Sequence, residues 1–271
     1  MFPILRLTVH RSPKLKCIAA LHMSAPHFPL NADVESRTRA PPVQVAAAWA
    51  GAYPSVNAPQ PSATLLPLSQ GAPGYGPPTV FTERIASESK ALSAHAYTHG
   101  LGEPVLRKAV AQDICSAYGT NTVTADNIAI TCGCNMAFAA SVAAIAERGD
   151  SVVLPYPWYF NHEMTLTAMG INVIPIHASD GTVNPEDIRP LLRDRVRAVV
   201  IVTPSNPTGT TYTSEKLAAT AQICREKRVA LIIDETCVTT NELPRIRIGY
   251  QRAGTVSMEG TACPFQALYR R

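Results

Sequence analysis

The chain has 271 residues, 46% hydrophobic and 16% charged, which is typical of a globular domain with one sizeable core. A formal net charge of +4, without a basic stripe carrying interleaved aromatic residues, argues against a nucleic-acid partner. No apolar run approaches the length of about 18 residues that a membrane span needs, so no membrane partner is expected.

The first 32 residues contain no Asp or Glu, and their charged residues are all basic. This N-terminal extension is either a mitochondrial presequence or a disordered or wrongly assigned start, with Met23 as the true initiator. Pro3 and Pro13 favour the second alternative, because proline weakens an amphipathic helix. We therefore predict a cytoplasmic protein, or a mitochondrial matrix protein if the presequence is genuine.

Residues 33–80 are rich in Pro, Ala and Ser and predict a meandering N-terminal arm. The glycines at its end are not preceded by a strand and followed by a helix, which argues against a dinucleotide fingerprint. Residues 82–91 and 103–118 are predicted as helices. The second has an apolar stripe of Val105, Leu106, Ala109, Val110 and Ile114.

From residue 128 the pattern becomes regular, with predicted strands at 128–132, 152–154, 171–176, 198–202 and 229–234. Helices are predicted between them at 135–146, 162–169, 185–193 and 214–227, with Asn184 as an N-cap. This alternation predicts an α/β fold with a mainly parallel, doubly wound sheet flanked by helices. The last strand is apolar and β-branched, so we expect it to be buried on both faces. Residues 240–271 show no clear period and receive no assignment.

Seven cysteines are scattered along the chain. Cys132 and Cys134 have no second pair or histidine cluster at zinc spacing, so we predict free thiols, no metal site and an intracellular protein.

Several polar groups should meet where the strands end, because ligands bind outside the carboxyl ends of parallel strands. The backbone N–H groups of Cys134 and Asn135 open a helix and suit a phosphate, although any tight turn has the same form. Trp158 could stack on a flat ring or simply pack. Asp234 could keep a pyridine nitrogen protonated or act as a structural acid. Asn206 could donate to a phenolate-like oxygen, in a segment that is also a good turn. Together these groups describe one ligand, pyridoxal phosphate.

The sequence from about residue 68 to 235 resembles the fold-type I, class I/II aminotransferases. The motifs that carry the resemblance are the Tyr97-to-Gly102 spacing before Leu106-Arg107, the Gly133 turn, Trp158, Asn206-Pro207-Thr208-Gly209 and Asp234-Glu235. The resemblance implies the large domain of a pyridoxal-phosphate-dependent transferase, incomplete and spanning residues 81–239, with an amino acid and a 2-keto acid as substrates.

The resemblance also implies a role for each matched residue. Tyr97 would reach the phosphate of a neighbouring subunit, which implies a homodimer. Gly71 and Asn206 would lie at the substrate. The residues implied in cofactor binding are Tyr97, Gly133, Cys134, Asn135, Trp158, Asn206 and Asp234.

Departures from the family pattern limit what the resemblance implies. Cys237 replaces a tyrosine that bonds the ring hydroxyl, and no lysine follows Lys227. The family's Schiff-base lysine and its later arginines therefore have no match, and we assign no catalytic residue. We expect a large domain cut short by truncation or by a faulty gene model, and inactive as written.

Two other functions are compatible with parts of the sequence. One is a non-catalytic protein of the same fold that binds pyridoxal phosphate or another small ligand. The other is a nucleotide hydrolase, since residues 231–235 resemble a Walker B strand. It is disfavoured because no G-x-x-x-x-G-K-[ST] motif precedes them.

Overall fold

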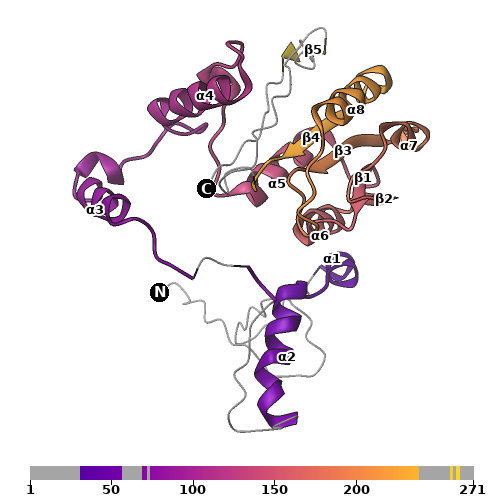
Figure 1. Cartoon of the computed structure of the whole chain (residues 1–271), viewed down its shortest axis with the longest axis horizontal. Coiled ribbons are helices and arrows are strands. Elements are labelled where there is room, and N and C mark those ends of the chain that lie inside the picture. Colours follow the sequence, from indigo (N-terminus) through magenta and orange to yellow (C-terminus); the bar gives the residue numbers. More distant parts are fainter. Residues whose placement is uncertain (1–30, 57–68, 72–73, 238–256, 259–260, 263–271) are drawn as a thin grey trace. The chain divides into compact units, whose positions relative to one another are not determined.

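The computed structural model describes residues 31–56, 69–71, 74–237, 257–258 and 261–262 (Figure 1). Its contacts divide the chain into two units. Unit 1 contains residues 39–98, and unit 2 contains residues 30–38 and everything from residue 99 onward. The predicted N-terminal extension (1–32) lies outside the described residues except for its last two. The predicted tail (240–271) does so except for β5 (Ser257–Met258) and β6 (Thr261–Ala262), which pair antiparallel.

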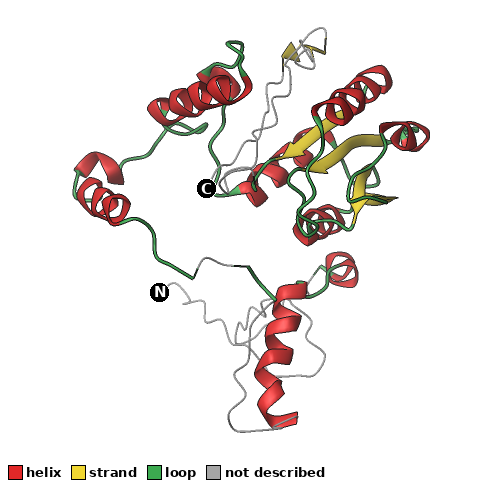
Figure 2. Ribbon diagram, in the orientation of Figure 1, coloured by secondary structure: helices red, strands yellow, loops and turns green. Residues whose placement is uncertain are grey.

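Unit 2 is built on a parallel sheet of four strands in the order β2-β1-β3-β4 (Figure 2). The strands are β1 (Ser151–Tyr156), β2 (Asn172–His177), β3 (Val196–Val202) and β4 (Ala230–Asp234). Helices connect them in turn: α6 (Phe160–Met169), α7 (Pro185–Ile188) with the 3₁₀ turn η3 (Arg189–Leu191), and α8 (Ser214–Lys227). Helix α5 (Cys134–Ile145) precedes β1. The predicted β–α alternation is confirmed.

Helices cover both faces of this sheet, because the side chains of each strand alternate in direction. Val152 and Leu154 of β1 pack with Phe138 of α5 and Leu166 of α6. Val153, between them, packs in a second cluster that includes Leu217 and Ile223 of α8. The predicted doubly wound sheet, with helices on each face, is therefore confirmed.

The prediction that the last strand is buried on both faces is wrong for the described chain. Every residue of β4 is only partly buried. The physical reason is its place at the edge, since β3 is its only neighbour among the described strands. Leu231 and Ile233 pack against one cluster, and Ala230 and Ile232 against the other.

The strand predicted at 128–132 is absent; only Ile128 forms an isolated bridge. The neighbouring elements supply its backbone partners instead. The Arg107 guanidinium of α4 (Pro104–Tyr118) donates to the carbonyls of Ala125, the first residue of η2 (Ala125–Asn127), and Ile128, the residue after η2. The Ile130 amide donates to the Leu101 carbonyl (2.9 Å).

The buried face of α4 also differs from the predicted stripe. Its buried residues are Arg107, Ala111, Ile114 and Ala117, whereas Val105 and Leu106 are exposed. The buried arginine decides the orientation, because a guanidinium out of water must keep its carbonyl partners. At the other end of the helix, the Tyr118 hydroxyl donates to the carboxylate of Glu235, just after β4.

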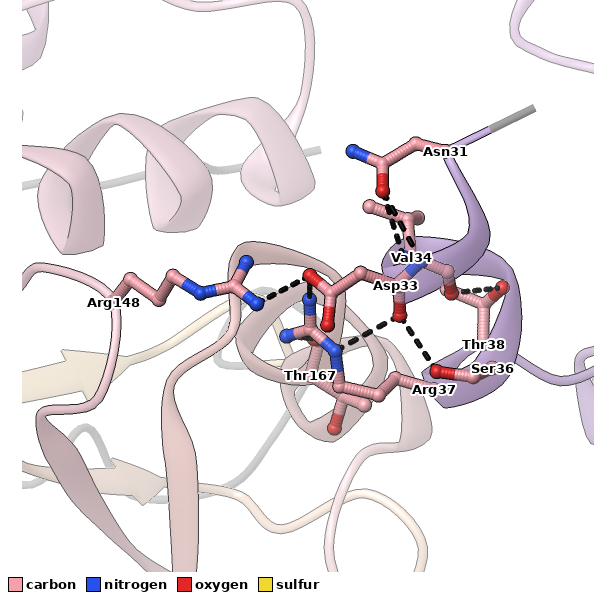
Figure 3. A network of polar contacts seen from close by, with 8 residues as sticks. All are labelled: Asn31, Asp33, Val34, Ser36, Arg37, Thr38, Arg148 and Thr167. Carbon is pink, nitrogen blue, oxygen red and sulfur yellow. Dashed lines mark hydrogen bonds and ion pairs between the residues drawn. The ribbon is translucent and has the colours of Figure 1, made fainter. Parts of the chain in front are cut away.

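A short helix, α1 (Ala32–Arg37), makes the polar contacts that Figure 3 shows, and it belongs to unit 2 although unit 1 follows it in sequence. Asn31 caps it by accepting from the amides of Asp33 and Val34. Asp33 pairs with both Arg37 and Arg148, and Arg37 donates to the Thr167 carbonyl near the end of α6 (3.2 Å). Charge pairs and a helix-end contact thus attach α1 to the sheet's helical layer.

Unit 1 contains α2 (Pro42–Val56), α3 (Thr79–Glu88) and the 3₁₀ turn η1 (Leu92–His95). The predicted meandering arm is therefore wrong at residues 42–56, where the alanine-rich sequence is a good helix former. None of the described residues of unit 1 is classed as buried. In the described chain, no helix combines the length and apolarity needed to span a membrane.

Candidate functional site

Asp234 closes β4 and is largely buried, with 12% of its side chain exposed. One carboxylate oxygen, Oδ1, accepts from the Thr236 amide (3.0 Å) and hydroxyl (2.5 Å). The other, Oδ2, lies 3.1 Å from Nε2 of His162. Burial alone would raise the pKa of Asp234, but the bonds from His162 and Thr236 outweigh it and lower that pKa. The arrangement keeps a carboxylate ionised at the carboxyl end of the sheet.

His162 lies in the first turn of α6 and is 2% exposed. Phe138 of α5 packs on its ring at 4.1 Å between centroids, and the ring of Tyr159 meets it edge-on at 5.3 Å. These aromatic contacts fix the ring so that Nε2 faces Asp234. Sequence reasoning missed this residue; the signal was a histidine in the first turn of the helix after β1.

The turn before α5 presents free backbone donors. Gly133 has φ +88, a conformation that favours glycine, and the Thr131 hydroxyl donates to its carbonyl (3.0 Å). No side chain among the described residues caps this 12-residue helix. The first N–H groups of the helix, including those of Cys134 and Asn135, therefore remain available to an anion, and the helix dipole favours negative charge there.

The loop after β3 is held by its own backbone. The Ser205 amide donates to the Thr210 carbonyl (2.8 Å), and the Gly209 amide donates to the Ser205 carbonyl (2.7 Å). The buried Thr203 hydroxyl accepts from the Tyr212 amide (3.1 Å). This loop contains cis peptide bonds before Pro204 and Pro207, and it presents Asn206 with an exposed side chain.

Trp158, His162 and Asn206 line one small pocket at the carboxyl edge of the sheet, together with Tyr212. The pocket volume is about 20 Å³, room for roughly one water molecule. The structure thus brings together Trp158 and Asn206, and connects them through His162 to Asp234. It does not place the Gly133 turn in this pocket, although α5 packs against α6 through Phe138.

The remaining predicted residues lie elsewhere. Tyr97 and Gly71 belong to unit 1, and both are exposed. Cys237 is half-buried, three residues after Asp234. Lys216, in the first turn of α8, binds the Thr182 hydroxyl and lies 3.2 Å from the Asp180 carboxylate. Hydrogen bonds from Thr182, and then Lys216, lower the pKa of Asp180 to about 2. In the described part of the chain, no group of three His, Cys, Asp or Glu residues could hold a metal ion.

Comparison with known proteins identifies the family. Residues 63–239 match the family model described as aminotransferase class I and II. This chain belongs to that family. Members of the class I and II aminotransferases use pyridoxal phosphate. The uncapped start of α5 and the carboxylate of Asp234 have the chemistry that would suit a phosphate and a protonated ring nitrogen.

Individual aminotransferases are also similar to this chain in sequence. The chain is 32% identical over 204 residues to a valine–pyruvate aminotransferase of Mycobacterium tuberculosis, covering 74% of this chain and 51% of that protein. It is 27% identical over 184 residues to human kynurenine–oxoglutarate transaminase 3, covering 64% of this chain and 40% of that one.

A crystal structure of a Mycobacterium tuberculosis aminotransferase superposes with a TM-score of 0.65 at 29% identity, covering 78% of this chain and 52% of that one. The chain therefore spans about half the length, or less, of the aminotransferases it matches.

Proposed function

We propose that this chain forms the pyridoxal-phosphate-binding part of an enzyme that transfers an amino group between an amino acid and a 2-keto acid. The observation that carries the proposal is Asp234, a largely buried carboxylate kept ionised by His162 and Thr236. Such a group is costly unless it meets a cation. A protonated ring nitrogen is a cation of the right kind. When bound, the cofactor supplies the electron sink of the reaction.

Each remaining group has a separate task in this proposal. The Cys134 and Asn135 amides bind the phosphate, and Trp158 covers one face of the ring. Asn206 donates to the ring hydroxyl oxygen and lies near the substrate with Gly71. Tyr97 reaches the phosphate of a neighbouring subunit, so the complete protein is a homodimer. A cytoplasmic location, or the mitochondrial matrix if residues 1–32 are a presequence, completes the proposal.

We further propose that the 271-residue polypeptide binds the cofactor only reversibly. No lysine follows Lys227 in the sequence, and Lys216 is already paired with Asp180. A bound amino acid would then have no positioned amine to carry its Cα proton, and losing such an acid–base group costs about 10²–10⁴-fold in rate.

Borohydride reduction of the protein with pyridoxal phosphate, followed by intact mass, tests the proposal. We expect saturable binding by fluorescence, no stable adduct on one specific lysine, and no keto-acid production. Lys216→Arg serves as a control, because it should behave like the unaltered chain. A stable adduct on one lysine together with keto-acid production would contradict reversible binding. Absence of any saturable binding would contradict the proposed cofactor site itself.

A further inference from the structure

Trp158 lines the pocket from the loop between the end of β1 and the start of α6. Among the described residues, no hydrogen bond holds its backbone or its indole nitrogen. The half-buried ring packs on one side against the cluster that contains Phe138 and Leu166. The orientation of the indole therefore depends on the side chains that contact it, because neither a strand nor a hydrogen bond fixes it.

Tyr156, the last residue of β1, contacts this indole with its own ring. The two rings lie at 79° to each other, with 5.3 Å between their centroids. This edge-on arrangement is one that aromatic pairs prefer, and the separation falls within the usual range of about 4.5–7 Å. Tyr156 is 51% exposed and is not among the residues that line the pocket. Its contact with the pocket is therefore made through Trp158.

Tyr156 is fixed in a way that Trp158 is not. It stands opposite His177 in the parallel pairing of β1 with β2, and its carbonyl accepts from the Ala178 amide (3.0 Å). The His177 ring lies 6.3 Å from the Tyr156 ring between centroids, so a second ring limits where the tyrosine can turn. A side chain on a paired strand has a fixed backbone and few rotamers. Tyr156 thus offers a rigid surface to a ring that lies in a loop.

We propose that Tyr156 is a positioning residue, whose ring holds the indole of Trp158 in the orientation that lines the pocket. An edge-on contact of this kind favours one arrangement of two rings by about 2- to 10-fold in population. Without it, the indole samples other orientations in its loop. The consequence for pyridoxal phosphate rests on the proposed function, in which Trp158 covers one face of the cofactor ring; the orientation of the indole itself does not.

Fluorescence and near-UV circular dichroism of the protein without cofactor test the proposal. The chain has two tryptophans, so Trp49→Phe, at a position that is 73% exposed, leaves Trp158 as the only one. In this background we expect Tyr156→Leu to weaken the tryptophan bands of the circular dichroism and to add fast ring motion to the decay of the fluorescence anisotropy. Tyr156→Phe keeps the ring and should leave both signals unchanged.

Two outcomes would overturn the proposal. One is a Tyr156→Leu variant whose tryptophan signals match those of the background. The other is a Tyr156→Phe variant that behaves like Tyr156→Leu, because the contact is assigned to the ring and not to the hydroxyl.

A double-mutant cycle of Tyr156→Leu and Trp158→Leu, measured by urea denaturation, covers the case in which the leucine variant is too unstable for spectroscopy. We expect the two substitutions to be non-additive by about 2- to 10-fold in the unfolding equilibrium constant. Additive effects would contradict the contact.

Titration with pyridoxal phosphate measures the consequence for the cofactor. Tyr156→Leu should weaken binding by about 2- to 10-fold, whereas Tyr156→Phe should bind like the unaltered chain. Equal affinity in Tyr156→Leu would remove Tyr156 from the cofactor site. If the unaltered chain bound no pyridoxal phosphate, the proposed function would fail, whereas the measurements on the cofactor-free protein would still decide whether Tyr156 positions Trp158.

Discussion

Units 1 and 2 both contain large apolar side chains, but unit 2 buries many of them and the described part of unit 1 leaves them exposed. In unit 2, Leu166 and Ile201 are completely buried between the sheet and its helices. In unit 1, Trp49 is 73% exposed and Phe81 is 56% exposed, and no described residue is classed as buried. A helix becomes stable in a protein mainly through the face it buries. The sheet therefore supplies the stability of this chain, and the apolar residues of unit 1 add little to it.

Leu166→Ala should cause the largest loss of stability among these variants and tests the buried core of unit 2. The side chain is fully buried in the cluster between α6 and the sheet, and removing it leaves a cavity. We expect the free energy of unfolding to fall by about 2–5 kcal/mol. Urea denaturation measures it. A loss below about 1 kcal/mol would mean that the sheet is not the stabilising core.

Asp234→Asn concerns the part of the proposed site that lies in unit 2. A charge-assisted pair with a protonated ring nitrogen contributes about 1.5–3 kcal/mol, so its loss should weaken pyridoxal phosphate binding roughly 10- to 150-fold. Cys237→Ala is the matched control, since a thiol is only a weak donor. Fluorescence titration gives both dissociation constants. Equal values for the two variants would remove Asp234 from its proposed role.

Thr236→Val tests how the buried carboxylate is held. The folded pKa of Asp234 lies below its unfolded value of about 3.9, so the hydrogen bond stabilises the protein above that pH. We expect a loss of about 1–2 kcal/mol at pH 7 that shrinks as the pH falls through the folded pKa. Thr220→Val is the control, because it removes a buried hydroxyl that donates to the Lys216 carbonyl, a group that does not titrate. The stability lost in this variant should therefore not change with pH. Parallel pH profiles of the two variants would contradict this account.

Phe81→Ser is the smallest expected effect and the direct test of unit 1. The ring is more than half exposed on α3, which has no buried residue. We expect the free energy of unfolding to change by less than about 0.5 kcal/mol. Urea denaturation alongside Leu166→Ala provides the comparison. A loss above 1 kcal/mol would show that unit 1 has a core of its own.

Much of the sheet could be predicted because local signals agree with the fold. Helix α8 begins and ends where its pattern predicts, and Asn184 caps α7 as expected. Residues 128–132 could not be predicted as they are, because a strand needs a neighbour and the local pattern does not reveal one. The orientation of α4 could not be predicted for a similar reason. Arg107 binds carbonyls that lie 18 and 21 residues further along the chain, beyond the end of the helix.

In the site, too, local sequence predicted some residues, whereas contacts between distant segments could not be predicted. Asp234 ends a strand, Trp158 and Asn206 follow strands, and that local signal predicted all three at one edge of the sheet. The contact of Asp234 with His162 joins the end of β4 to the start of α6, and no sequence spacing reveals that these two meet. Tyr212 was missed because its position beside the pocket follows from the fold of the loop after β3.

The attachment of α1 has a consequence for the order of folding. Asp33 and Arg148 are 115 residues apart, and Arg37 reaches a carbonyl 130 residues away. For a flexible chain, closing a loop of this size costs about 4 kcal/mol beyond a constant term. The contacts of the six-residue helix α1 can offset this loop-closure cost only after the sheet and α6 have formed, because the partners of α1 lie there. Residues 31–38 should therefore join last during folding and detach first, so the amide of Thr38 exchanges with solvent long before those of β3.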